Sequence, residues 1–314
     1  MVAITSGKLL ITGGSGYIGA WIVKRAVDRG YSVVAAVRTD AHGQFIVNRF
    51  PEYQGKVSYV LIPVIEKDGA YDEAVKDVDG IIHAASPVIF NWDDPQEVLR
   101  PAIRGALGIL ESAHKYGKNI KRIVLTSSSA AATTQFEALG KDTHPSTVYA
   151  ASKTYAEQSS WAWVKEQKPS WDLVTILPPF IWGPYVHKPG KPSFGSSPGL
   201  LLDNVLNRSD TSGAYAGDSA DVRDTADIHV LALENPDAGG ERVLTATDSF
   251  AWQDVYDIFN SAGFPNVNAP GKTTRGAGKQ KTPSATSTAK ALGCGPTSGI
   301  TRSKRRSGIW VNSW

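Results

Sequence analysis

The chain of 314 residues carries 33 basic and 30 acidic side chains, a formal net charge of +3, and 41% of its residues are hydrophobic. This composition excludes a disordered chain and predicts a globular protein with one sizeable core, or a core plus a lobe. No stretch approaches 18 apolar residues and no signal peptide opens the chain, so we predict a cytoplasmic protein without membrane contact. The single cysteine, Cys294, excludes an internal disulfide, and no Cys/His cluster indicates a metal site.

The first segment predicts a strand, a glycine turn and a helix in direct succession. Residues 8–12 have the pattern of a short buried strand, and residues 20–29 have the apolar spacing of a helix. Between them, Gly13 permits a tight turn, Gly16 lets the backbone approach a pyrophosphate, and Gly19 lets the helix lie close to the strand. A glycine cluster alone is usually an ordinary loop, but in this setting we interpret it as a dinucleotide cradle.

The next strand, residues 32–37, ends in Arg38, where the adenosine ribose of a dinucleotide is expected. A guanidinium suits a 2′-phosphate, whereas an acidic residue there would accept hydrogen bonds from a 2′-hydroxyl. Arg38 therefore favours NADPH over NADH. The negative charge of Asp40, two residues further on, would reduce the attraction of this region for a phosphate. The alternative is a solvated arginine at a strand end.

Apolar strands alternate with helical stretches from about residue 8 to residue 177. This alternation predicts an α/β fold with a Rossmann-type, doubly wound parallel sheet. His83, at the end of one strand, is interpreted as a satisfied strand-end residue rather than a ligand. A segment rich in Pro, Gly and Ser follows Gly183 and marks the start of a smaller lobe. We predict an NADPH-binding domain over residues 1–183, with a return to it near 219–234, and a C-terminal substrate lobe over 184–314.

Tyr149 and Lys153 lie four residues apart in a stretch with helical spacing, so their side chains face the same way. A nearby ammonium favours phenolate, so we expect it to lower the pKa of Tyr149 towards the range of a general acid. An apolar strand at residues 123–126 leads into Ser127 and Ser128, where a hydroxyl could meet the same carbonyl oxygen. Together with the glycine turn, this order of motifs predicts a nicotinamide site that protonates a carbonyl.

These motifs resemble those of the extended short-chain dehydrogenase/reductases, and within them the dihydroflavonol reductase, cinnamoyl-CoA reductase and fungal aldehyde/ketone reductase group. The resemblance covers residues 6–288 and rests on LLITGGSGYIG, VRTD, AYDEAVKDVDGIIHAASP, RIVLTSSSAA, VYAASKTYAEQ, ILPPFIWGP and VRDTADIHVLALE. It implies that Ser128 hydrogen-bonds the substrate carbonyl, Tyr149 donates the proton and Lys153 holds the nicotinamide ribose. It also implies a set of cofactor-binding residues: Gly13, Ser15, Gly16, Tyr17 and Ile18 at the pyrophosphate, Arg38 at the 2′-phosphate, Ala84 and Ala85 along the adenosine, and Pro178 and Ile181 at the nicotinamide carboxamide.

Five apolar residues follow predicted strands and are candidates for the wall of a substrate pocket. An aldehyde or ketone with an aromatic or aliphatic side chain would suit such a wall. Each of these residues could instead fill the core. They are Val88, Phe90, Phe180, Trp182 and Tyr185.

Two departures from the family pattern concern the pocket and the adenine. The segment between Ser128 and Tyr149 is shorter than in the family, near residues 134–136, so we expect part of the pocket rim to be missing. Val64 stands where the family commonly has an acidic residue near the adenine, which predicts weaker adenine binding.

The C-terminal segment has an unusual charge. Residues 258–314 contain nine of the basic residues and none of the acidic ones, which leaves −6 on the remainder of a chain whose total is +3. We predict that the last 20 or so residues form a disordered, degenerate tail. The alternative, a tail that binds nucleic acid or an acidic partner, is disfavoured because no aromatic stacking platform accompanies the charge.

The sequence therefore predicts an NADPH-dependent carbonyl reductase that acts on a small aldehyde or ketone, as a monomer or homodimer without a nucleic-acid partner. One alternative is a sugar-nucleotide epimerase or hydroxysteroid dehydrogenase, which uses the same residues with tightly held NAD. The other is an inactive NADP(H)-binding sensor. Retained Tyr149 and Lys153 argue against the sensor, and Arg38 argues against NAD.

Overall fold

The central layer of the protein is a large, almost entirely parallel sheet. The computed structural model describes residues 4–86, 92–132, 139–186, 196–207, 216–262 and 310–312. Within them, the strand order is β11-β9-β6-β5-β4-β1-β2-β3, and the seven strands from β9 to β3 are parallel. The strands are β1 (Lys8–Thr12), β2 (Ser32–Val37), β3 (Val57–Leu61), β4 (Gly80–His83), β5 (Arg122–Thr126), β6 (Asp172–Leu177), β9 (Arg242–Leu244) and β11 (Trp310–Asn312).

The prediction of a Rossmann-type sheet is confirmed. The order β3-β2-β1-β4-β5-β6 is that of a doubly wound dinucleotide-binding fold, with the reversal of strand order between β1 and β4. Every residue of β4 and β6 is buried, as expected for parallel strands covered on both faces. The ends of β1 and β4 therefore lie side by side at the point where such folds bind ligands.

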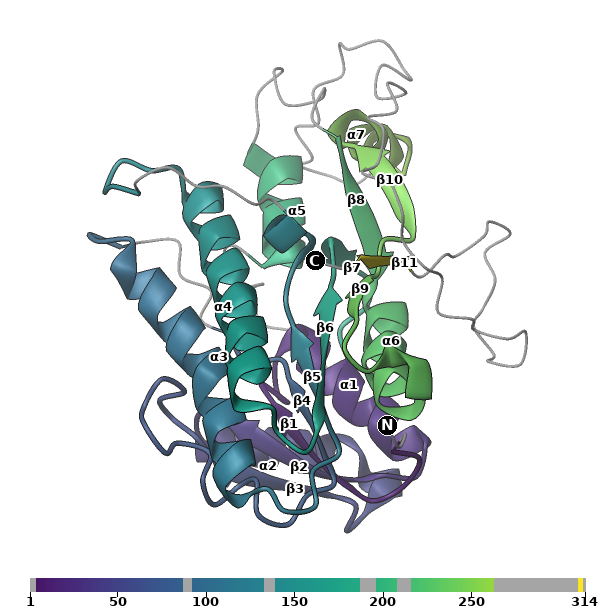
Figure 1. The fold of residues 1–314 in the computed structure, drawn as a ribbon. Coiled ribbons are helices and arrows are strands. Elements are labelled where there is room, and N and C mark those ends of the chain that lie inside the picture. Colours follow the sequence, from purple (N-terminus) through teal and green to yellow (C-terminus); the bar gives the residue numbers. More distant parts are fainter. Residues whose placement is uncertain are drawn as a thin grey trace.

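Helices cover both faces of this sheet (Figure 1). On one face, α1 packs against α6, and on the other, α3 packs along α4. The face under α1 and α6 is filled by apolar side chains such as Ile22, Val23 and Val230, and the opposite face by Ala106, Ile109 and Ala156. The helices are α1 (Tyr17–Asp28), α2 (Asp40–Arg49), α3 (Gln96–Tyr116), α4 (Pro145–Gln167) and α6 (Val222–Glu234), with short 3-10 turns η1 (Pro51–Tyr53), η2 (Ser129–Ala132) and η3 (Pro236–Ala238).

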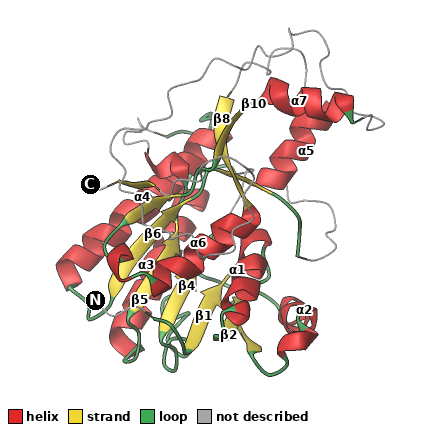
Figure 2. Ribbon diagram, turned by 90° about the vertical axis from the view of Figure 1, so that its right-hand side faces the viewer, coloured by secondary structure: helices red, strands yellow, loops and turns green. Residues whose placement is uncertain are grey.

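A smaller layer lies beyond the carboxyl ends of the central strands (Figure 2). It contains a three-stranded sheet in the order β10-β8-β7 and two helices. Aromatic and branched side chains, among them Phe250, Trp252 and Tyr256, form its separate core. Its elements are β7 (Phe180–Trp182), α5 (Ser197–Asn207), β8 (Ala216–Asp221), β10 (Asp248–Ala251) and α7 (Trp252–Ser261).

The chain passes between the two layers more than once. β7 already belongs to the small sheet, although residues 1–183 were assigned to the cofactor domain. The return to the central layer is predicted near 219–234. Within this range, residues 222–234 form α6, which packs against α1, while residues 216–221 pair with β7 and β10 in the small sheet. Hydrogen bonding to the small sheet, rather than sequence pattern, sets this boundary.

The end of the chain also differs from its prediction. Residues 310–312 form β11, which pairs with β9 in the antiparallel direction, so the expected disorder does not hold for these three residues. The rest of the basic tail, residues 263–309, lies outside the described residues. None of the described helices combines the length and hydropathy that a membrane span requires.

Candidate active site

The glycine turn after β1 is folded tightly against the start of α1. Gly13 has a φ of +68°, in the left-handed region that favours glycine, and a Cβ there would lie 3.0 Å from the backbone nitrogen of Ala85. A Cβ at Gly19 would lie 2.0 Å from the carbonyl oxygen of Gly13, so only glycine permits this contact. The exposed Gly16 caps α1, and its N–H donates to the Gly13 carbonyl. The turn thus has the close backbone packing that a dinucleotide cradle requires.

The end of β4 lies against this turn. The hydroxyl of Thr12 accepts a hydrogen bond from the Ala85 N–H at 3.0 Å and contacts Nδ1 of His83 at 3.0 Å. Burial, together with the charge of Lys153, lowers the pKa of His83 to about 3, so its imidazole is neutral. The prediction that His83 is a satisfied strand-end residue is confirmed. Ala84 and Ala85, the predicted adenosine contacts, are half-buried at the same place.

The end of β2 presents Arg38 to solvent, and Arg38 takes part in none of the ion pairs found among the described residues. Thr39 caps α2 by accepting a hydrogen bond from the His42 N–H. Asp40 accepts a hydrogen bond of 2.5 Å from the hydroxyl of Tyr59 on β3. The carboxylate that complicated the predicted charge balance is therefore engaged by a neighbouring strand.

The predicted catalytic residues come together at the carboxyl end of β5. Residues 127–129, here called the serine turn, follow β5 and lead into η2. Tyr149 and Lys153 lie one turn apart on α4, which begins at Pro145. The hydroxyl of Tyr149 is hydrogen-bonded to that of Ser128, which is only 7% exposed. The structure thus joins two side chains that are 21 positions apart in the sequence.

The expected lowering of the Tyr149 pKa is not observed. Burial raises the pKa of the Tyr149 phenol, and the hydrogen bond to Ser128 acts in the opposite direction but is the smaller effect. Burial also lowers the pKa of Lys153 to about 8, against the charge of Glu157, which raises it. The reason for the discrepancy is that Lys153 is buried and Tyr149 is half-buried, and reduced contact with water disfavours the charged form of each. Tyr149 is therefore a protonated phenol at neutral pH.

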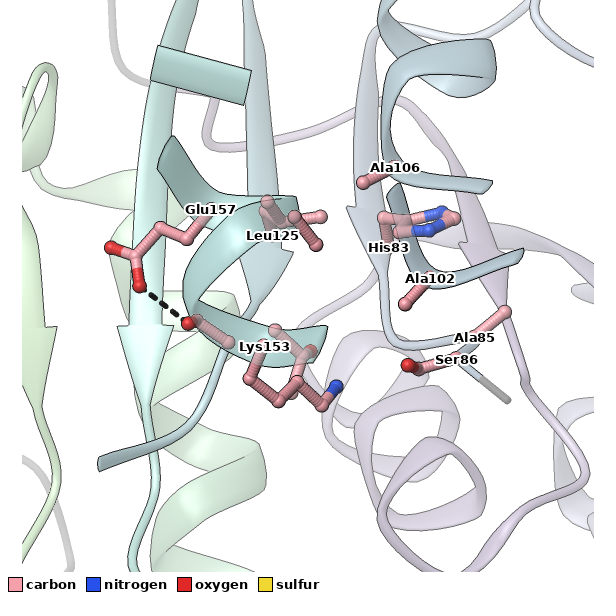
Figure 3. Close-up of a pocket in the computed structure, with 11 residues that line it drawn as sticks. His83, Ala85, Ser86, Ala102, Ala106, Leu125, Lys153 and Glu157 are labelled. Carbon is pink, nitrogen blue, oxygen red and sulfur yellow. Dashed lines mark hydrogen bonds between the residues drawn. The ribbon is translucent and has the colours of Figure 1, made fainter. Parts of the chain in front are cut away.

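A small cavity lined by both polar and apolar side chains lies beside Lys153, between α3, α4 and the ends of β4 and β5 (Figure 3). In this view the lysine side chain extends from α4 towards the side that carries Ser86. The polar side chains of the cavity come from β4, β5 and α4 and from the residues that directly follow the two strands, and alanine and leucine side chains complete the lining. The lining residues are His83, Ala85, Ser86, Ala102, Ala106, Leu125, Thr126, Ser127, Lys153, Ala156 and Glu157.

The predicted pocket wall is divided between two settings. Phe180 and Trp182 are half-buried in the small layer, where their rings lie 5.7 Å and 4.4 Å from the ring of Phe250. They therefore contribute to the core of that layer. Val88 and Phe90 lie outside the described residues, as do residues 133–138 of the shortened segment.

Tyr185, the last of these residues, belongs to a clamp between the two layers. Its ring lies 4.6 Å from the ring of Tyr17. The Tyr17 hydroxyl donates to the Gly183 carbonyl at 2.9 Å, and the indole N–H of Trp21 donates to the Pro184 carbonyl at 2.8 Å. Because the Tyr17 side chain is used in this way, a pyrophosphate at the turn would meet only its backbone.

The residues predicted at the nicotinamide lie where β6 ends. The carbonyl of Pro178 accepts a hydrogen bond from the Ser129 N–H at 2.9 Å, so this segment is fastened to the serine turn. Ile181 is buried within β7. Half-buried Ser15 and Ile18 flank Gly16 at the start of α1, and Val64 is half exposed after β3.

Two further residues of the site were not identified from the sequence. Glu157 is 1% exposed and Arg242 is 6% exposed, and they form an ion pair of 2.7 Å beside the serine turn. The signal for Glu157 was its position four residues after Lys153, one further turn along the same helix. Arg242 had no local signal, because it comes from a strand 85 residues away.

Comparison with known proteins agrees with this geometry. Residues 9–246 match the model of the NAD dependent epimerase/dehydratase family. The chain belongs to this family, and the predicted resemblance to the extended short-chain dehydrogenase/reductases is confirmed.

Relatives within the family are named as reductases, in agreement with the predicted group. The chain is 37% identical to the ketoreductase azaE of Aspergillus niger over 78% of this chain and 79% of the relative. It is 33% identical to a cinnamoyl-CoA reductase of Medicago truncatula over 83% and 82%. Among solved structures, yeast methylglyoxal/isovaleraldehyde reductase complexed with NADPH has a TM-score of 0.75 and 27% identity over 82% of each chain.

Proposed function

We propose that the protein is an NADPH-dependent carbonyl reductase that converts an aldehyde or ketone to an alcohol. The observation that carries this proposal is the hydrogen bond between Ser128 and Tyr149, with Lys153 one turn further along α4. This pair of hydroxyl groups lies at the carboxyl ends of the parallel strands, near the reversal of strand order. A carbonyl oxygen between them would receive one hydrogen bond and one proton.

In the proposed reaction, bound NADPH supplies a hydride to the carbonyl carbon. Tyr149 donates its phenolic proton to the carbonyl oxygen, which becomes the hydroxyl of the product, and Ser128 stabilises the negative charge that develops on that oxygen. The raised pKa of Tyr149 keeps its proton in place until the carbonyl arrives. The charge of Lys153 then offsets the negative charge left on the tyrosine oxygen.

Three features support NADPH as the cofactor. The Gly13 turn offers a cradle with backbone N–H groups and a helix N-terminus. Arg38 is exposed at the end of β2, while the nearby Asp40 is bonded to Tyr59. A 2′-phosphate would therefore meet a cation rather than an unengaged carboxylate. The solved relative from yeast is described as complexed with NADPH.

An apolar carbonyl compound suits the proposed site best. Phe180 and Trp182 begin the small layer two residues after Pro178 and are only half-buried, so part of each side chain remains outside the core of that layer. Such aromatic surface would suit an apolar substrate. Relatives are named for ketone, methylglyoxal and cinnamoyl-CoA substrates, which differ in size but share a reducible carbonyl.

The test is oxidation of NADPH, followed by its absorbance, with a panel of aromatic and aliphatic aldehydes and ketones. We expect turnover with NADPH in preference to NADH, and a loss of about 10²–10⁴-fold in Tyr149→Phe. Tyr116→Phe, at the far end of α3, is the matched control and should retain turnover. Binding of NADPH without turnover on any carbonyl would contradict the proposal and favour a sensor, whereas NAD retained through purification would favour an epimerase.

A further inference from the structure

The side chain that links most elements of the site has no role in the reaction proposed above. Glu157 lies on α4 one turn beyond Lys153, and its carboxylate is bonded from three other elements. Its Oε2 accepts a hydrogen bond of 2.5 Å from Ser127, and its Oε1 accepts hydrogen bonds of 2.8 Å from Thr175 and 2.7 Å from Arg242. One carboxylate thus joins α4, the serine turn, β6 and β9.

Arg242 extends this network to η2, which follows the serine turn. Its Nε donates to Glu157, while its Nη2 donates to the carbonyl of Ala131 in η2 at 3.3 Å. Ser127 is thus held by the carboxylate and Ala131 by the guanidinium. Ser128 lies between these two anchored points, so the position of its hydroxyl is determined from both sides.

We propose that the buried Glu157–Arg242 ion pair positions the catalytic groups of this reduction: it fixes the serine turn against α4 and holds a negative charge beside the catalytic lysine. The proposal rests on the function proposed above. Glu157 acts through its neighbours and touches no reacting atom, so it is a positioning residue.

The geometric part of the proposal follows from the helix. Tyr149, Lys153 and Glu157 recur every four residues, so they lie along one side of α4. The bond from Ser127 to Glu157 therefore sets the distance between the serine turn and the side of the helix that carries Tyr149. A misplacement of 1 Å at such a site costs on the order of 10²-fold in rate.

The electrostatic part concerns Lys153. Burial lowers the pKa of Lys153 to about 8, and the charge of Glu157 opposes this shift. The titratable groups that line the adjoining cavity are His83 from β4 and Lys153 and Glu157 from α4, while Arg242 faces Glu157 from β9. His83 is neutral and does not affect the charge balance at neutral pH. The negative charge of Glu157 therefore helps Lys153 to keep its proton near neutral pH.

The role is not explained by stability alone. A buried ion pair commonly contributes little net stability, because desolvation of both charges offsets their attraction. A second pair in this protein, Arg122 and Asp172, is buried as deeply but contacts no residue of the proposed site. It supplies a matched control in which the same chemistry is removed from a different place.

The experiment compares Glu157→Gln, Ser127→Ala and the control Asp172→Asn in the full-length protein. For each we would measure kcat and KM from pH 6 to 10, and the pH midpoint at which Lys153 reacts with acetic anhydride, read by mass spectrometry. In Glu157→Gln we expect kcat to fall at least tenfold, and both the alkaline limb and the labelling midpoint to move to lower pH. Ser127→Ala should lower kcat without moving either midpoint, because it removes an anchor but no charge.

Each outcome decides the proposal. Unchanged kcat and unchanged midpoints in Glu157→Gln and Ser127→Ala would overturn it, as would the same midpoint shift in Asp172→Asn. If Glu157→Gln does not fold, Ser127→Ala, which removes a single hydroxyl, still tests the anchor through kcat. If the wild-type protein reduces no carbonyl, the proposed function fails, while the labelling midpoint of Lys153 still reports on the charge of Glu157.

Discussion

The protein buries two arginine–carboxylate pairs that touch the same strand, β6, at different points. Arg122 and Asp172 stand at the amino ends of β5 and β6, with contacts of 2.6 Å and 2.8 Å between their side chains. Arg242 and Glu157 meet at Thr175, three residues further along β6. Both pairs are almost completely shielded from water. They differ in what the remaining donors of each arginine contact.

Arg122 donates to the carbonyl oxygens of Ala232 and Asn235 at the end of α6, so its pair fastens a helix to the sheet. Arg242 instead donates to Ala131 in the segment that carries the catalytic serine. The same kind of ion pair, an arginine with a carboxylate, therefore serves the fold at the amino ends of the strands and the site further along them. The local sequence does not distinguish the two pairs. They differ in the carbonyl groups to which the remaining guanidinium nitrogens of each arginine donate.

The largest expected effect is that of Arg242→Met. This change leaves the Glu157 carboxylate buried without its counter-charge, which should lower the free energy of unfolding by about 3–5 kcal/mol. We also expect at least a tenfold loss of kcat for the fraction that remains folded. Chemical denaturation measures the loss of stability, and NADPH oxidation measures the loss of kcat. Full activity of the folded fraction would contradict the proposal that the Arg242–Glu157 pair serves the site and not only the fold.

Arg122→Met should destabilise the protein to a similar extent, about 3–5 kcal/mol, because it leaves the buried carboxylate of Asp172 uncompensated. In contrast, the kcat of the folded protein should stay within about twofold of the wild-type value, a change of less than about 0.5 kcal/mol in the barrier. Denaturation curves and assays below the unfolding transition measure both quantities. A loss of kcat as large as in Arg242→Met would show that the two pairs do not differ in role.

The pH dependence of the free energy of unfolding should reveal the contribution of the buried imidazole of His229, as distinct from that of the ion pairs. Burial lowers the pKa of His229 to about 4, and this residue bonds Thr126 at the end of β5. The folded-state pKa lies below the unfolded value of about 6.5, so its stabilising contribution is present above about pH 6.5 and is lost as the pH falls towards 4. We expect a loss of up to about 3 kcal/mol over this range.

Equilibrium unfolding as a function of pH measures this effect, with His229→Gln as the comparison. The variant should be less stable at pH 7 but should lose less stability on acidification than the wild-type protein. An identical pH dependence in both would exclude His229 as the source.

The smallest effect is expected at an exposed pair. Lys24 and Asp28 are one turn apart on α1 and 2.9 Å from each other, but both remain in contact with water. Because solvent screens such a pair, Lys24→Ala should change the free energy of unfolding by no more than about 0.5 kcal/mol. Thermal or chemical unfolding measures the change. A loss of stability comparable with that in Arg122→Met would mean that burial does not determine how much an ion pair contributes to the free energy of unfolding.

Patterns within a short segment were sufficient to predict the sheet, the Gly13 turn and the placement of Tyr149 and Lys153 one turn apart on a helix, because each depends on residues within one or two elements. The lobe boundary required knowledge that residues 216–221 pair with β7, which no local pattern encodes. The predicted direction of the Tyr149 pKa shift was wrong because burial, which raises this pKa, is a property of the whole fold. Arg242 was missed for the same reason, since its partner is 85 residues away.

The clamp formed by Tyr17 and Trp21 has a consequence for how the dinucleotide and the carbonyl compound bind. Both residues stand on the first turns of α1, directly after Gly16, and they hold the carbonyl groups of Gly183 and Pro184, where the chain leaves for the small layer. A molecule that binds at Gly16 would therefore restrict the motion of the small layer, and a molecule held by that layer would in turn favour occupation of the turn. Thermodynamic linkage requires these two effects to be equal in free energy. We therefore expect the dinucleotide and the carbonyl compound each to tighten the binding of the other by the same factor.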